Sequence, residues 1–173
     1  MSNEKQNIFE LLAKEFELRP SDYYFLDLIP LIEMIWADGE NQPAELALLY
    51  HFTIEHIAHL DRAAGIPLIT TEDANDFLER FAHRRPPQRL LDALSELVLD
   101  SASSADSERN RSILQYCMDI AAACTTQYPY ALRGRIVDSE KALFHKLFTA
   151  FQKNTASTRT KPNTNNENIH GNL

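Results

Sequence analysis

The strongest candidate for chemistry in this 173-residue chain is an acidic turn between two apolar segments, Ala37-Asp38-Gly39-Glu40-Asn41-Gln42-Pro43-Ala44-Glu45. Carboxylate oxygens gathered in a turn are the ligands that calcium and magnesium prefer. The turn would place Asp38 at the end of one helix and Glu45 in the first turn of the next. Calcium usually takes about six to eight oxygens, so Asp38, Glu40 and Glu45 predict a weak divalent-cation site.

The same turn also has a structural interpretation. Pro is favoured as the first residue of a helix, so Pro43 puts Gln42 at the N-cap and Glu45 at the third helical position. A Glu there accepts a hydrogen bond from the N-cap backbone N–H and complements the positive end of the helix dipole. Glu108 and Glu140 fit the same role after turns that otherwise differ. One Glu kept in three differing turns favours capping over metal binding.

His51, Glu55 and His59 form a second candidate site, because residues four apart share one face of a helix. His56 joins His59 at a spacing of three. Imidazoles so placed bind zinc or iron, which gives the alternative function, a metal-dependent enzyme or metal sensor that uses this face and the acidic turn. Di-iron bundles, however, use Glu-x-x-His, and Glu55 and His59 are one residue further apart. A polar helix face with modest Glu–His pairing explains the same pattern.

Nucleophile motifs are missing from the sequence, which has no Gly-x-Ser-x-Gly, no glycine-rich phosphate loop and no Cys beside a plausible His. The sequence therefore gives no positive reason to infer an enzyme. It favours a non-catalytic binding or adaptor domain that docks a protein partner. No cofactor is indicated apart from the possible calcium or magnesium ion at the acidic turn.

Composition excludes several other classes. The formal net charge of −8 argues against nucleic-acid binding, which needs clustered Lys and Arg. No apolar run reaches the roughly 18–20 residues of a membrane span, and the N-terminus is no signal peptide, so we expect a cytoplasmic protein. Cys117 and Cys124 share one side of a predicted helix, too far apart for a disulfide with each other, and we expect reduced thiols in the core.

Helical periodicity and the small number of glycines predict an all-α fold, a compact bundle of about seven helices. The expected helices cover residues 3–17, 22–37, 43 to the break at 65, 71–84, 88–100, 105–125 and 138–153. Pro30 should kink or split the second of these. On the first helix, the apolar stripe predicted to face the core consists of Ile8, Leu11, Leu12 and Phe16.

The acidic turn recurs along the chain. A second copy, Leu99-Asp100-Ser101 followed by Glu108, has one extra residue in the turn, and a third, Gly134 to Glu140, keeps the spacing of Gly39 to Glu45. Such recurrence indicates duplicated helix-turn-helix units, and we expect an internal repeat that relates residues 28–58 to residues 90–121.

The paired units resemble the tellurite-resistance TerB-like family, whose mark is an apolar helix that ends in Ala-x-Ala-Asp-Gly and a Glu that opens another. Ala37-Asp38-Gly39 and Glu45 match this pattern, whereas Ser101 replaces the Gly of the second copy. The resemblance covers about residues 22–125 of a single predicted domain, 1–153, and a polar tail, 154–173, is expected to be disordered. The resemblance to the TerB-like family implies an all-helical fold, a link to tellurite or stress response, suspected metal binding, an adaptor role and no known catalysis.

Overall fold

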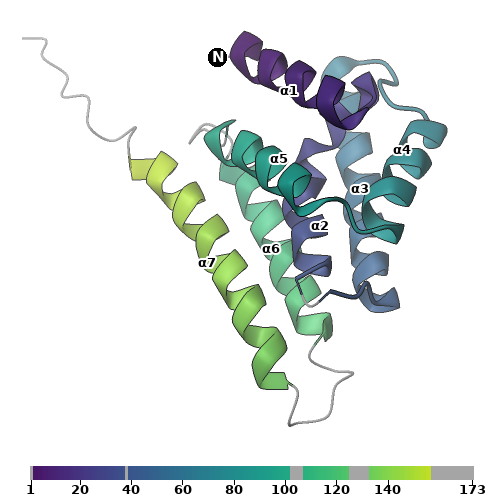
Figure 1. Cartoon of the computed structure of the whole chain (residues 1–173). Coiled ribbons are helices and arrows are strands. Elements are labelled where there is room, and N and C mark those ends of the chain that lie inside the picture. Colours follow the sequence, from purple (N-terminus) through teal and green to yellow (C-terminus); the bar gives the residue numbers. More distant parts are fainter. Residues whose placement is uncertain (1, 38, 102–106, 125–132, 157–173) are drawn as a thin grey trace, which may run out of the picture.

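The computed structural model describes residues 2–37, 39–101, 107–124 and 133–156. Within these residues the chain forms seven α-helices and no strand, which confirms the predicted all-α class (Figure 1). The elements in order are α1 (Ser2–Phe16), the 3₁₀ helix η1 (Pro20–Leu28), α2 (Ile29–Ile35), α3 (Pro43–Ala64), α4 (Thr71–Leu78), the π-helix η2 (Glu79–His83), α5 (Gln88–Ser101), α6 (Ser107–Cys124) and α7 (Arg133–Ala156).

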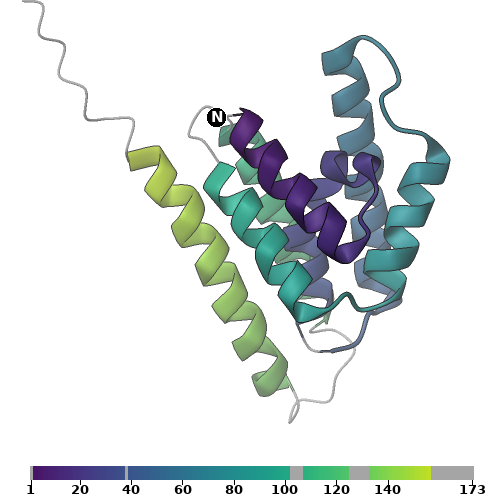
Figure 2. The same cartoon turned by 45° about the horizontal axis from the view of Figure 1, so that its top comes forward.

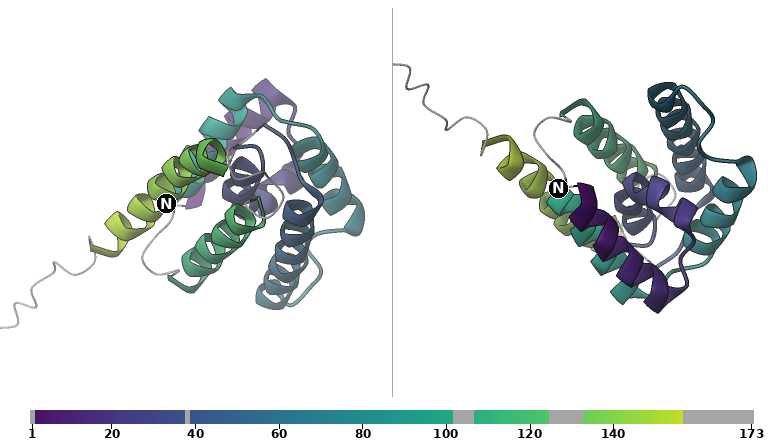
Figure 3. Two further views of the ribbon diagram at one scale, coloured as in Figure 1. Left: turned by 90° about the horizontal axis from the view of Figure 1, so that it is seen from below. Right: turned by 90° about the horizontal axis from the view of Figure 1, so that it is seen from above.

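The short helix α2 is the centre of the bundle. All seven of its residues are buried, and it packs against α3, α5, α6 and α7, which surround it in the end-on views of Figure 3. A helix that is buried on every side must be apolar almost all round, and Ile29-Pro30-Leu31-Ile32-Glu33-Met34-Ile35 has a single charged residue. Trp36, Leu49 and Leu94 are buried in the core around α2, and Leu114 is half-buried against it.

Pro30 splits the predicted helix 22–37 in two, as expected. The chain runs as 3₁₀ helix to Leu28, and α2 begins at Ile29 with Pro30 in its first turn. Pro lacks the backbone N–H that a helix interior requires but is tolerated in a first turn. The chain therefore changes helix type where the proline stands.

Helix ends follow the local signals. α3 begins at Pro43 and ends at Gly65, whose φ of 72° lies in the left-handed region that glycine adopts without steric cost. α4 begins after Thr70, whose hydroxyl accepts from the Asp73 backbone N–H at 3.1 Å. α3 and α4, joined by the short connection between these two ends, both lie on the side of the bundle away from α7 (Figures 1 and 2).

The predicted core stripe of α1 is wrong at two of its four positions, Ile8 and Leu11. Phe9 is buried, whereas Ile8 is exposed and Leu11 is 66% exposed; Leu12 and Phe16 are half-buried. α1 packs on α5, and Phe9 forms an edge-to-face pair with Tyr23 at 5.3 Å between ring centroids. When apolar residues cover more than half of the circumference of a helix, their spacing does not determine which of them face the core. The contacts of α1 with α5 and η1 bury Phe9.

The third copy of the turn is not a turn. Gly134 to Glu140 lies inside α7, which begins at Arg133 rather than near residue 138. Glu140 is therefore eight residues into the helix and buried, so its predicted capping role is wrong. α7 also continues to Ala156, past the predicted boundary at 153, and the rest of the expected tail, 157–173, lies outside the described residues.

The described helices show no membrane span: none of them is both long enough and apolar enough to cross a bilayer.

Candidate functional site

The acidic turn is tied to the fold at both ends. The Glu45 side chain is 0% exposed, and its Oε2 accepts from the Gln42 backbone N–H at 2.8 Å, so the predicted capping interaction is confirmed. Trp36 Nε1 donates to the carbonyl of Phe81 at 2.9 Å, and Asn41 Nδ2 donates to that of Ala82 at 2.7 Å. Both carbonyls belong to η2, at a helix end whose last carbonyls lack partners within the helix.

The three predicted cation ligands are not equally placed. Asp38 lies outside the described residues, Glu40 is exposed, and Glu45 is buried with its carboxylate on a backbone N–H. In addition, the Arg85 guanidinium lies over the turn, 3.7 Å from where a Cβ on Gly39 would stand. Across the described residues, no three His, Cys, Asp or Glu side chains group as metal ligands. The cation site, which includes Asp38, stays a prediction.

The histidine face of α3 joins α6 through a tyrosine. Tyr116 Oη donates to Glu55 Oε2 at 2.7 Å and lies 2.7 Å from His51 Nδ1, and His51 Nδ1 is 3.9 Å from Glu55 Oε1. Burial and the hydrogen bond to Glu55 raise the pKa of Tyr116 to about 12, so this hydroxyl stays a donor. His59 is exposed. The modest Glu–His pairing expected for this face is confirmed, with Tyr116 as a third member that the spacing did not reveal.

His56 leaves this face and enters a buried polar cluster. Its Nε2 donates to the Tyr24 carbonyl at 2.7 Å, and its Nδ1 is 3.8 Å from Asp27 Oδ2. Asp27 also holds a bidentate pair with Arg109. Burial alone would raise the pKa of Asp27, but Arg109 and, less strongly, His56 and Lys5 lower it overall. The cluster connects α1, η1, α3 and α6, and no local sequence signal could have found it.

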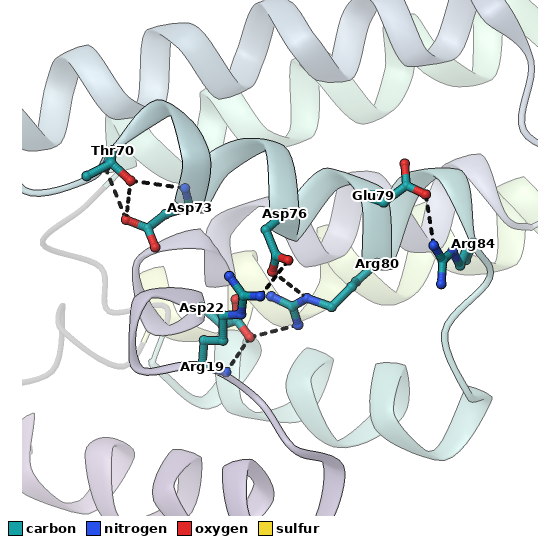
Figure 4. Close-up of polar contacts among 8 residues, drawn as sticks. All are labelled: Arg19, Asp22, Thr70, Asp73, Asp76, Glu79, Arg80 and Arg84. Carbon is teal, nitrogen blue, oxygen red and sulfur yellow. Dashed lines mark hydrogen bonds and ion pairs between the residues drawn. The ribbon is translucent and has the colours of Figure 1, made fainter.

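A second ion-pair cluster fastens η1 to α4 and η2 (Figure 4). Asp22, 2% exposed, accepts from Arg80 Nη1 and Nη2 at 3.0 and 2.6 Å and from the Arg19 backbone N–H at 2.8 Å. Asp76 accepts from Arg80 Nε at 2.7 Å and pairs with Arg19 Nη2 at 2.8 Å. Asp22 is the third residue of η1, and the backbone N–H that it accepts from belongs to the N-cap residue, Arg19. The four charged groups, those of Arg19, Asp22, Asp76 and Arg80, pair with one another, so this cluster is structural.

The predicted reduced core thiol is confirmed for Cys117, which is buried and free. Burial, with Glu33 nearby, raises the pKa of its thiol far above the usual range, and a neutral, enclosed thiol is unreactive. The Cys124 side chain and the Tyr128-Pro129-Tyr130 stretch lie outside the described residues.

An apolar groove of about 790 Å³ opens between α6 and α7. Two large apolar residues on its border are exposed, Met118 on α6 by 50% and Phe148 on α7 by 41%. The lining residues are Met118, Ala121, Ala122, Glu140, Lys141, Phe144, His145 and Phe148. Ala121 and Ala122 of α6 form the wall opposite α7, and alanines within a helix give no sequence signal of a groove.

Comparison with known protein families, with curated proteins and with solved structures finds no match to this chain.

Proposed function

We propose that this chain is a non-catalytic helical binding domain whose α6–α7 groove receives an amphipathic helix of a partner protein. The observation that carries the proposal is the exposure of Met118 and Phe148 on facing helices around one apolar groove. Contiguous exposed apolar surface is costly for a protein in water and marks interaction sites. In helix-in-groove binding, regularly spaced apolar side chains of the partner helix pack into such a groove.

The dimensions of the groove fit a short helix. Its α7 wall runs from Glu140 to Phe148, which at the helical rise is about 12 Å, or roughly two turns. The small side chains of Ala121 and Ala122 let a partner backbone come close to α6. Lys141 and His145 border the groove and are exposed, and α7 has five Lys or Arg against two Asp or Glu in a chain of net charge −8. We therefore expect acidic residues beside the apolar stripe of the partner helix.

The resemblance to TerB-like domains supports the same function, because that family implies an adaptor role in tellurite or stress response without catalysis. We include in the proposal a weak divalent-cation site at Asp38, Glu40 and Glu45 that would regulate partner binding. The burial of Glu45 and the position of Arg85 weigh against it. No described contact favours the alternative of a metal-dependent enzyme or sensor, since His51 and Glu55 engage Tyr116.

The test uses fluorescent synthetic helical peptides with one apolar stripe, flanked by Glu in one peptide and by Lys in another, and fluorescence anisotropy with the full chain. Burying a large apolar side chain contributes about 1.5–3 kcal/mol. Met118 and Phe148 are already half covered, so Met118→Ser and Phe148→Ser should each weaken binding of the Glu-flanked peptide by roughly fivefold. Leu11→Ser, an equally apolar and exposed position on α1, is the matched control and should change the affinity less than about twofold.

Three results would contradict the proposal. The first is no saturable binding of either peptide, and the second is binding that neither groove variant weakens. The third is a dimer in sedimentation equilibrium that both groove variants dissociate, because the groove would then hold a second copy of this chain. Tighter binding of the Lys-flanked peptide would overturn the inferred acidity of the partner.

A further inference from the structure

A second, smaller cavity of about 210 Å³ opens beside the acidic turn, at the junction of α2, α5 and α7. Its lining residues are Glu33, Trp36, Ala37, Arg85, Gln88, Leu91 and Leu143. It is separate from the α6–α7 groove and shares no lining residue with it. It therefore presents a site that the proposed docking function does not use.

Glu33 is the unusual group in this cavity. Its side chain belongs to the buried helix α2, is only 8% exposed, and accepts one hydrogen bond, from Ser95 Oγ to Oε2 at 2.8 Å. No Lys, Arg or His of the described chain forms an ion pair with it. Lys146 is near enough to act on Glu33 electrostatically, but it forms no ion pair with it. A buried carboxylate without a close counter-charge is costly, so a proton or a cation that enters the cavity would stabilise Glu33.

Arg85 supplies the opposite charge on the same cavity. Arg85 is exposed, and no ion pair among the described residues joins it to a carboxylate, Glu33 included. The cavity thus lies between a carboxyl group on its buried wall and a guanidinium at its mouth. Trp36 contributes an indole ring to the wall, and an indole face attracts organic cations.

We infer that this cavity binds a small zwitterion, with an ammonium group directed at Glu33 and Trp36 and a carboxylate directed at Arg85. The size agrees, because a cavity of about 150 Å³ accommodates benzene, and 210 Å³ accommodates a molecule of slightly more non-hydrogen atoms. A divalent metal fits less well, because among the described residues Glu33 is the only carboxylate that lines the cavity.

The protonation state of Glu33 is consistent with this assignment. Burial raises the pKa of Glu33, the Ser95 hydrogen bond and the charge of Lys146 lower it, and Asp92 raises it, for a net increase. An ammonium that binds to the ionised form must displace the proton. Affinity should therefore increase as pH rises, a readout that a merely structural Glu33 would not give.

Trp36 is the only tryptophan of the chain and lines the cavity, so its fluorescence reports binding directly. The probes are 4-aminobutyrate, butylamine and butyrate, which share one chain length and differ only in charge. With the full chain, 4-aminobutyrate should bind most tightly, butylamine less so, and butyrate least. Glu33→Gln should weaken 4-aminobutyrate and butylamine at least tenfold, whereas Arg85→Gln should weaken 4-aminobutyrate about tenfold and leave butylamine within about twofold.

Leu143→Phe provides an independent test if Glu33→Gln does not fold, because it fills the cavity and keeps both charges. It should abolish the fluorescence response to all probes while the circular dichroism spectrum stays helical. The inference is overturned if no probe gives a saturable response at 10 mM or below, roughly the weakest affinity worth calling a site. It is also overturned if folded Glu33→Gln or Leu143→Phe binds like the wild type. The peptide anisotropy experiment is unaffected by either result, so this inference and the proposed function fail separately.

Discussion

Replacing Glu45 tests whether the acidic turn serves the fold or a cation. Its carboxylate is fully buried and accepts from the Gln42 backbone N–H at 2.8 Å. Glu45→Gln keeps an oxygen that can accept this bond and removes the charge that faces the positive end of the α3 dipole. The expected loss of unfolding free energy is about 0.3–1 kcal/mol.

Glu45→Ala removes the acceptor as well. A hydrogen bond to a charged group contributes about 1.5–3 kcal/mol, and the deleted methylene contributes about 0.8 kcal/mol of burial. The loss should therefore be about 2–4 kcal/mol. For a chain of this size about 1 kcal/mol corresponds to 2–4 °C, so the melting temperature should fall by about 1–4 °C in Glu45→Gln and by roughly 4–16 °C in Glu45→Ala.

Thermal unfolding monitored by circular dichroism, with and without added calcium or magnesium, distinguishes the two roles. If Glu45 only caps α3, added calcium or magnesium leaves the melting temperatures of the wild type and of the Glu45 variants unchanged. If the turn binds a cation, the wild type gains stability as the ion concentration rises, because a ligand bound only by the native state stabilises it. An ion-dependent increase that disappears in both Glu45→Gln and Asp38→Asn would refute the capping argument and make the cation site functional.

Two further predictions concern the ion pairs. Arg80→Met should lower the free energy of unfolding, measured in urea, by about 3–5 kcal/mol, because it leaves the buried Asp22 carboxylate without its counter-charge. The control Arg84→Met removes one partner of an exposed pair and should lower it by less than about 1 kcal/mol. Equal losses in the two variants would contradict this account. Asp27→Asn should destabilise the protein at neutral pH, and the difference from the wild type should shrink as pH falls below about 4. Arg109 lowers the pKa of Asp27 in the folded state, so the ionised Asp27 stabilises the fold above the pKa that it has in the unfolded chain, and this stabilisation is lost when Asp27 is protonated. A stability difference that does not change with pH would contradict this prediction.

The parts of the fold that the sequence predicted well depend on neighbours a few residues away. Pro30 divides a helix because of its own ring, Pro43 begins α3 for the same reason, and Gly65 ends it through its own freedom at positive φ. Glu45 capping is a contact over three residues. Each of these features follows from local chemistry that any fold must respect.

The features that were missed depend on partners far along the chain. His56 belongs by spacing to the face of His59, but Tyr24 and Asp27 draw it into a buried cluster. Glu33 looks like an ordinary polar residue of a helix until its partner Ser95, 62 residues away, encloses it. The α6–α7 groove likewise needs two helices whose distance apart no periodicity specifies.

The acidic turn illustrates why a sequence motif can be informative about architecture and silent about activity. Trp36, directly before the turn, and Asn41 within it provide donors for the carbonyls of η2, and Glu45 provides an acceptor for the start of α3. A chain that reverses between two helices must satisfy these backbone groups, so the residues of the turn have a structural role that needs no ligand. Residues whose polar groups are consumed in this way are poor ligands for anything else. The groups that the fold leaves available for a ligand are the apolar rim at Met118 and Phe148 and the enclosed carboxyl group of Glu33.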